Sequence, residues 1–144
     1  MSAISTRPDI STLEVPRDAW SAPFWEAASE HRLVFPLCAS CGRYRWPPGP
    51  FCPACRSQEV SWAEAGEGLI FSYTILGPAV AGGGEGGPLV PSLIEFPAAG
   101  GVRLIAALVD SPIDRISIGA RVAPVWVAAR DAILPMFRLA EGVS

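Results

Sequence analysis

Short apolar runs, separated by glycine and proline, fill the second half of the chain. Five of them are rich in β-branched and aromatic residues, and they lie at 68–76, 91–96, 102–109, 121–128 and 133–139. Runs of this length and composition predict β-strands. The last two contain Pro124 and Pro135. Because proline cannot donate to a strand ladder, these positions indicate strand edges or bulges.

Five short strands with turn residues between them predict a small barrel of the OB-fold type, and a β-sandwich is the alternative. The segment 82–87, between the first two strands, is almost entirely glycine, which predicts a flexible loop. It contains no lysine and does not match the phosphate-binding pattern G-x-x-x-x-G-K.

The N-terminal third has a different pattern. Residues 1–19 are polar and show no periodicity, which predicts an extended or mobile arm that a partner surface would hold in place. Ser21 can cap a helix and Pro23 suits its first turn, so we expect a helix from there to about Glu30. A short strand at 31–37 should follow. A second strand should lie between the last cysteine and Ala65.

Composition and charge narrow the functional classes. Of the 144 residues, 50% are apolar and 17% are charged, which is typical of a globular protein. The net charge is −3 and every basic residue is arginine, so bulk charge disfavours a polyanion ligand. The N-terminus lacks an apolar signal core, and the longest uncharged run is broken at Gly77 and Pro78. We therefore expect no membrane span and a cytoplasmic protein.

All four cysteines lie within eighteen residues, as two C-x2-C pairs separated by ten residues: Cys38, Cys41, Cys52 and Cys55. Two such pairs can present four thiolates to one tetrahedral Zn²⁺, and four thiolates leave no open position for catalysis. Disulfides would require an oxidising compartment, and a redox C-x-x-C is expected in a βαβ context. An iron–sulfur centre is the remaining alternative, but the paired spacing favours a structural zinc ion.

These patterns divide the chain into an arm at 1–19, a helix with a zinc ribbon at 20–64 and an OB-fold domain at 65–144. The catalytic inventory is small, because His31 is the sole histidine and the chain has no lysine. We therefore expect no catalytic residues in this chain. Nucleic-acid binding is disfavoured by the acidic balance, although the ribbon contains the basic and aromatic run 43–46.

The order of the motifs resembles the DUF35 family. The likeness covers roughly residues 20–140. Its motifs are P-F-W-E at 23–26, C-A-S-C-G-R at 38–43, W-P-P at 46–48, C-P-A-C at 52–55, G-L-I-F-S-Y-T at 68–74 and I-L-P-M-F-R at 133–138. The glycine-rich loop at 82–87 departs from the family, whose loop is more aromatic and polar.

The resemblance implies a mainly β fold in which an N-terminal helix and a rubredoxin-like zinc ribbon precede a five-stranded OB-fold barrel. It also implies a non-catalytic accessory subunit of a thiolase-like enzyme (a thiolase, aldolase or acyltransferase) acting on acyl-CoA. The partner carries the catalytic residues, and a hot-dog-fold hydratase can join the complex. The small subunit would stabilise that complex and help to form the CoA or acyl channel, and Cys38, Cys41, Cys52 and Cys55 would hold a structural zinc.

Residues of the helix and the ribbon are the candidates for the partner interface: Phe24, Trp25, Arg43, Tyr44, Arg45 and Trp46. Aromatic residues and arginine are common at the centres of protein interfaces. The alternative functions are a stand-alone acyl-CoA-binding module and a single-stranded nucleic-acid-binding OB-fold protein. For the former, Arg43, Arg45 and Arg103 are candidate phosphate contacts.

Overall fold

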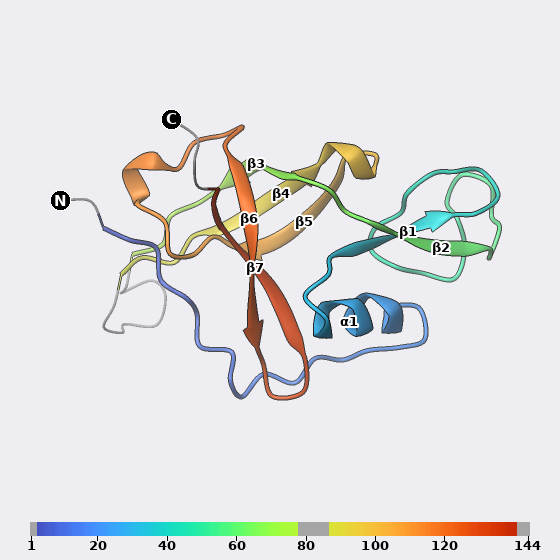
Figure 1. The fold of residues 1–144 in the computed structure, drawn as a ribbon, viewed down its shortest axis with the longest axis horizontal. Coiled ribbons are helices and arrows are strands. Elements are labelled where there is room, and N and C mark those ends of the chain that lie inside the picture. Colours follow the sequence, from blue (N-terminus) through green and yellow to red (C-terminus); the bar gives the residue numbers. More distant parts are fainter. Residues whose placement is uncertain (1–2, 78–86, 141–144) are drawn as a thin grey trace.

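The structure is a computed structural model that describes residues 3–77 and 87–140. It confirms a mainly β fold with one helix, a two-stranded ribbon and a curled five-stranded sheet (Figure 1). In chain order the elements are α1 (Ala22–Ser29), β1 (Val34–Cys38), β2 (Val60–Glu64), β3 (Gly68–Tyr73), β4 (Pro91–Phe96), β5 (Val102–Ala107), β6 (Arg121–Ala128) and β7 (Ile133–Leu139). The loop expected at 82–87 lies, except for Gly87, outside the described residues. None of the described helices is long and apolar enough to cross a membrane.

The five-stranded sheet has the order β5-β4-β3-β6-β7, and all its ladders are antiparallel. Burial alternates along β4, where Ser92, Ile94 and Phe96 face the core. The two edge strands meet at one parallel bridge between Leu108 and Phe137, where the Val109 N–H donates to the Phe137 carbonyl at 2.7 Å. Among the described residues the sheet is thus a half-barrel that closes at a single point.

Two prolines lie where a missing N–H costs nothing in the β6–β7 ladder. The Phe137 carbonyl points away from β6 to Val109, so Pro124 and Phe137 form a pair that is not hydrogen-bonded within that ladder. Pro135, two residues earlier, has the same orientation. In addition, β3 pairs with β6 only as far as Val122. The edge positions expected for both prolines are confirmed.

One aromatic core joins the ribbon to the sheet. Phe35 of β1 is fully buried, and its ring packs edge-on against Trp46 at 5.0 Å and Phe96 at 5.1 Å between centroids. Phe24 of α1 lies 5.1 Å from Trp46, and Phe96 continues the chain of rings to Phe137 at 6.0 Å. The helix, the ribbon and the half-barrel therefore share one hydrophobic core.

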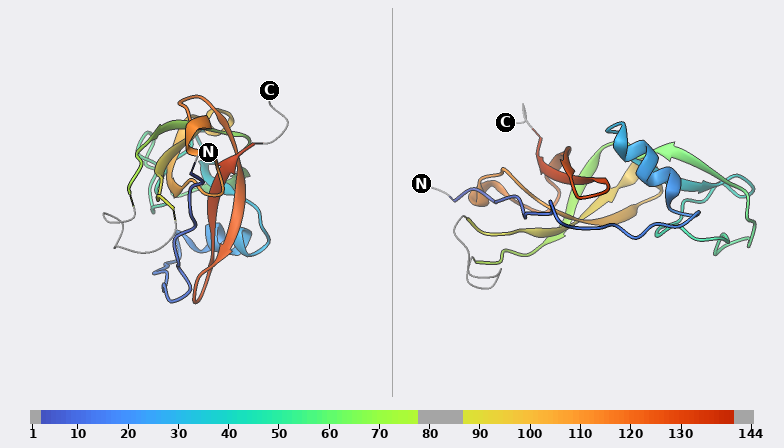
Figure 2. Two further views of the ribbon diagram at one scale, coloured as in Figure 1. Left: turned by 90° about the vertical axis from the view of Figure 1, so that its left-hand side faces the viewer. Right: turned by 90° about the horizontal axis from the view of Figure 1, so that it is seen from below.

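The N-terminal arm is extended, and loops between the strands of its own sheet hold it in place (Figure 2). Ser5 is 2% exposed, and its backbone exchanges hydrogen bonds with Ser111 and Asp110. Arg7 forms a two-pronged ion pair with the Asp110 carboxylate. Further along, the Val15 N–H donates to Asp131 at 2.9 Å. We expected a partner surface to hold this segment, but unpaired backbone groups of the arm find partners on this chain instead.

The start of α1 differs from the expected cap. Ser21 has helical dihedral angles, with φ −96° and ψ −11°, and its hydroxyl makes no capping bond. The Asp18 carboxylate accepts the N–H groups of Trp20 and Ser21 instead, at 3.0 and 2.8 Å. Because the backbone of Ser21 is already helical, its hydroxyl is not directed at the free amides of the first turn. The capping residue is therefore Asp18, three residues earlier.

Candidate functional site

The two cysteine pairs form matching turns. In the first, the N–H of Gly42 donates to the Cys38 carbonyl at 2.9 Å, and in the second the N–H of Arg56 donates to the Cys52 carbonyl at 2.8 Å. The residue that donates the hydrogen bond in each turn has a left-handed backbone conformation, with φ +77° at Gly42 and +65° at Arg56. Glycine adopts this conformation without strain, whereas Arg56 must have a structural reason to do so.

The four sulfurs converge on one point. All of them lie within 4.8 Å of one another, with Cys38 and Cys55 at 3.5 Å and Cys41 and Cys52 at 3.6 Å. A tetrahedron of thiolates around zinc, with Zn–S bonds of about 2.3 Å, has edges of roughly 3.8 Å. The sulfurs are therefore positioned to hold one metal ion of this size.

Backbone amides prepare some of these thiols for ionisation. The amide of Cys55 is the main donor to Cys52 and helps to lower the pKa of its thiol to about 6. The Cys41 amide likewise lowers the pKa of Cys38. At Cys41 the amide of Arg43 acts in the same direction, but desolvation and the neighbouring sulfurs outweigh it and raise the pKa to about 11. A bound cation would stabilise the deprotonated thiolates and so offset the unfavourable interaction between neighbouring sulfurs.

A buried arginine lies in the ribbon, four residues after the first cysteine pair. Arg45 is 6% exposed, and its Nε and NH1 have no hydrogen-bond partner among the described residues. Leu37 pairs with Tyr44, so side-chain alternation places Arg45 on the same face of the ribbon as Cys38 and Arg43. A zinc ion with four thiolates has a net charge of −2. An uncompensated buried guanidinium on that face fits such a centre.

The structure places the candidate interface residues in two groups. Phe24 is 5% exposed and lies in the core, so it offers almost no surface to a partner. Tyr44 and Trp46 also pack against that core, each half-buried. Arg43 is exposed, and the half-buried Trp25 ring has the Arg17 guanidinium 5.8 Å from its centroid. An interface role for this set stays a prediction.

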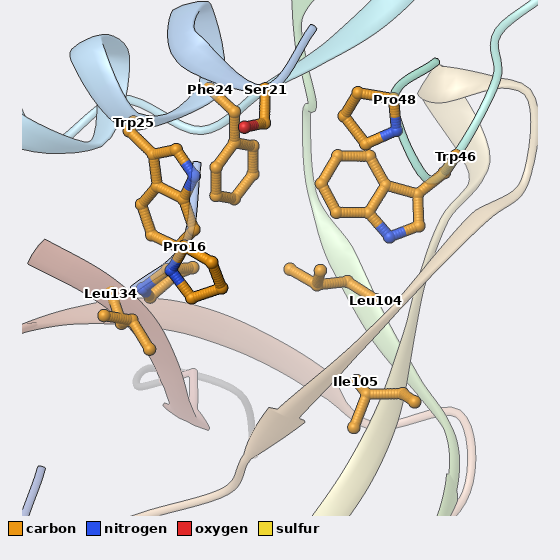
Figure 3. Close-up of a pocket in the computed structure, with 10 residues that line it drawn as sticks. Pro16, Ser21, Phe24, Trp25, Trp46, Pro48, Leu104, Ile105 and Leu134 are labelled. Carbon is orange, nitrogen blue, oxygen red and sulfur yellow. The ribbon is translucent and has the colours of Figure 1, made fainter. Parts of the chain in front are cut away.

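Sequence reasoning missed an apolar pocket of about 260 Å³ between the ribbon and the half-barrel (Figure 3). Phe24 and Trp25 of α1 and the ring of Trp46 form one side of it. Its other side comes from the edge strands: Leu104 and Ile105 of β5, and Leu134 and Pro135 of β7. The sequence had marked Phe24, Trp25 and Trp46 as interface candidates, but the pocket itself could not be foreseen because it depends on β5 lying opposite β7.

A second, more polar cleft of about 440 Å³ contains His31, Arg32, Glu64 and Glu67. His31 stacks flat on Trp126, with 5.6 Å between ring centroids and 9° between planes. The described residues that line this cleft include no serine, threonine or cysteine. His31 therefore has no hydroxyl or thiol beside it among these residues, and it makes a packing contact with Trp126 of β6.

The fold and the cysteine cluster define a zinc ribbon followed by an OB-fold. Family models agree: residues 25–61 match the ChsH2 rubredoxin-like zinc ribbon domain, and residues 63–127 match the ChsH2 C-terminal OB-fold domain. A solved structure described as an Ltp2-ChsH2(DUF35) aldolase is 34% identical, covers 88% of this chain and 98% of its own, and superposes with a TM-score of 0.74. The chain belongs to the DUF35 family, as its motifs predicted.

Two further comparisons extend this picture. A DUF35-family protein of unknown function from Sulfolobus solfataricus shares the fold, with a TM-score of 0.65, 19% identity and 85% coverage of each chain. A probable enoyl-CoA hydratase alpha subunit of Thermomonospora curvata is 40% identical over 118 residues, which is 80% of this chain. The chain spans only 36% of the length of that relative. The similarity therefore concerns the shared domains and not the whole hydratase subunit.

Proposed function

We propose that this chain is a non-catalytic accessory subunit of a thiolase-like acyl-CoA enzyme, a thiolase, aldolase or acyltransferase. It stabilises the complex and contributes to the channel for CoA or its acyl chain. The single observation that supports this most strongly is the end-to-end match to the Ltp2-ChsH2(DUF35) aldolase structure, whose own chain is covered to 98%. The likeness to a hydratase subunit supports a hydratase as a further partner.

The chemistry of the described residues supports a scaffold role. The sulfurs of the four cysteines converge on one point, where we propose that they bind a structural zinc ion: Cys38, Cys41, Cys52 and Cys55. A closed set of four thiolates keeps no position for substrate or water. The ion would fix the ribbon, and the ribbon in turn fixes Trp46 and Phe35 against the half-barrel. Cysteines that bind zinc must be reduced, and the cytoplasm keeps thiols reduced. We therefore also propose a cytoplasmic location.

Co-expression tests the proposal. The chain would be produced with candidate thiolase-like and hydratase-like subunits from the same organism, and the mixture separated by size-exclusion chromatography with light scattering. We expect a stable complex in which the larger subunit contains the activity and loses it, or loses solubility, without this chain. If the chain elutes alone and changes neither activity nor stability of any such subunit, the proposal is wrong.

Calorimetry on the isolated chain separates the alternatives. An acyl-CoA-binding module would bind CoA thioesters without any partner, whereas we expect no saturable binding. A nucleic-acid-binding protein would retain oligonucleotides at physiological ionic strength, which the net charge of −3 disfavours.

A further inference from the structure

The half-barrel opens where the sequence places a proline. β5 and β7 run parallel at the bridge between Leu108 and Phe137. In a parallel ladder the next donor along β7 is residue 135, which would reach the carbonyl of Ile105. Pro135 has no N–H, so this bond cannot form and the ladder stops at the bridge. The seam between the two edge strands therefore stays open on the side of α1.

The edge of β5 along this seam has backbone groups directed outward. The Leu108 N–H donates to the Val90 carbonyl at 2.9 Å, which shows that even-numbered residues of this strand face β4. Arg103 and Ile105 therefore direct their N–H and carbonyl groups away from β4 and toward the seam. No ladder covers this edge within residues 3–77 and 87–140. Such an edge is a template for another strand.

Next to Arg103, which is ion-paired with Glu95, the seam has an apolar stretch centred on Ile105. Ile105 is 78% exposed, the largest exposure among the bulky apolar residues of the described chain. Beside it lies the pocket of about 260 Å³ that Trp25, Trp46, Leu104 and Leu134 line. None of the side chains that line this pocket is charged. A ligand that fits both the open edge of β5 and the pocket must have unpaired backbone groups of its own and an uncharged, apolar side chain next to them.

We propose that the open seam between β5 and β7 receives an extended segment of the partner enzyme subunit. That segment adds as a strand to the edge of β5 and inserts an apolar side chain into the pocket beside Trp25 and Trp46. Main-chain bonds along an edge and a pocket for alternate side chains are the two elements of strand addition. An acyl chain could fill the pocket and contact Ile105, which lines it, but it would leave the backbone groups along the edge of β5 without partners. The inference rests on the proposed function, because it specifies where that partner docks.

The test uses the full chain and the thiolase-like or hydratase-like subunit with which it co-purifies. Ile105→Asp places a carboxylate on the seam, and Ile118→Asp is the matched control, because Ile118 is 70% exposed in the turn before β6. We expect Ile105→Asp to weaken the complex by about tenfold or more, the effect of an interface hot spot, and the control to leave the affinity within about twofold. Both positions are exposed, so both variants should fold.

Hydrogen exchange and a second variant examine the backbone directly. The amides of Arg103 and Ile105 should exchange about tenfold or more slowly in the complex than in the free chain. Pro135→Ala restores a donor that can reach the Ile105 carbonyl and close the seam. This variant should bind the partner several-fold more weakly while its own β-sheet signal is unchanged.

The outcomes are distinct. If the complex forms but Ile105→Asp acts no more strongly than Ile118→Asp, or the two amides stay unprotected, the inference is wrong and the proposed function stands. If octanoyl-CoA alone saturably quenches tryptophan fluorescence and displaces the partner, or if the free chain is a dimer that Ile105→Asp dissociates, another occupant fills the seam. If no subunit binds the wild-type chain, the proposed function fails and the inference fails with it.

Discussion

Replacing one cysteine should weaken the half-barrel as well as the ribbon. Cys52→Ser removes a buried thiolate from the cluster, and structural zinc contributes on the order of 10–16 kcal/mol to the folding of small ribbons. This contribution exceeds what the ribbon can supply from its own apolar contacts. Without the zinc ion the ribbon should therefore lose its fixed structure. The consequence reaches the sheet because Phe35 and Trp46 belong to the ribbon but pack in the shared core.

The size of this effect follows from burial. Exposing Phe35, which is fully buried, and the half-buried Trp46 costs roughly 1.5–3 kcal/mol for each side chain. For a domain of this length, 1 kcal/mol corresponds to about 2–4 °C in Tm. We therefore expect Cys52→Ser to lower the Tm of the sheet by about 6–24 °C.

Differential scanning calorimetry, with zinc content measured on the same samples, provides the assay. Ser40→Ala is the control, because Ser40 is an exposed, non-ligand residue of the first cysteine turn whose hydroxyl donates to the Ser57 hydroxyl at 2.9 Å. That change should shift stability by less than about 0.5 kcal/mol. A Cys52→Ser protein that has lost its metal but melts at the wild-type temperature would refute the argument that ribbon and sheet share one core.

The remaining predictions concern the turns, the core and proton release on metal binding. Gly42→Ala should destabilise the zinc-loaded protein by about 1–2 kcal/mol, because an added Cβ meets no neighbour there and only the left-handed backbone is strained. Arg56→Gly, at the matching position, should stabilise it by up to about 1 kcal/mol, and denaturant unfolding compares the two. Gly68→Ala should cost about 1–3 kcal/mol in the same assay, since its Cβ would lie 2.8 Å from Ile94 and 2.9 Å from Phe96. Calorimetry in buffers of different ionisation enthalpy should show that zinc binding at pH 7.5 releases fewer than four protons. The Cys52 pKa of about 6 leaves that thiol already ionised, and release should approach four as the pH falls below 6.

The strands and the cysteine cluster were predictable because local chemistry determines both. Paired C-x2-C spacing predicts convergent sulfurs, and apolar runs bounded by glycine and proline predict strands wherever they pack. The same holds for Pro124 and Pro135, whose missing N–H restricts them to positions that need no ladder hydrogen bond, such as the non-hydrogen-bonded pairs of β6 and β7.

What the sequence did not predict depends on contacts between distant segments. The arm lies on its own sheet because Ser5 meets Ser111, more than one hundred residues away. Phe24 lies in the core because Trp46 and Phe35 approach it from the ribbon. The pocket beside Ile105 arises from the position of β5 opposite β7, and no periodicity within either strand encodes that arrangement. The orphaned guanidinium of Arg45 likewise depends on what surrounds it after folding.

The most direct test of the account is the mass of the particle that contains this chain when it is co-expressed with a candidate thiolase-like subunit from the same organism. Size-exclusion chromatography with light scattering should find both chains in one particle, with a stoichiometric amount of zinc and with acyl-CoA activity that depends on the small subunit. A chain that elutes at its own mass of 15.2 kDa, while the larger enzyme is fully active and stable without it, would contradict the central claim.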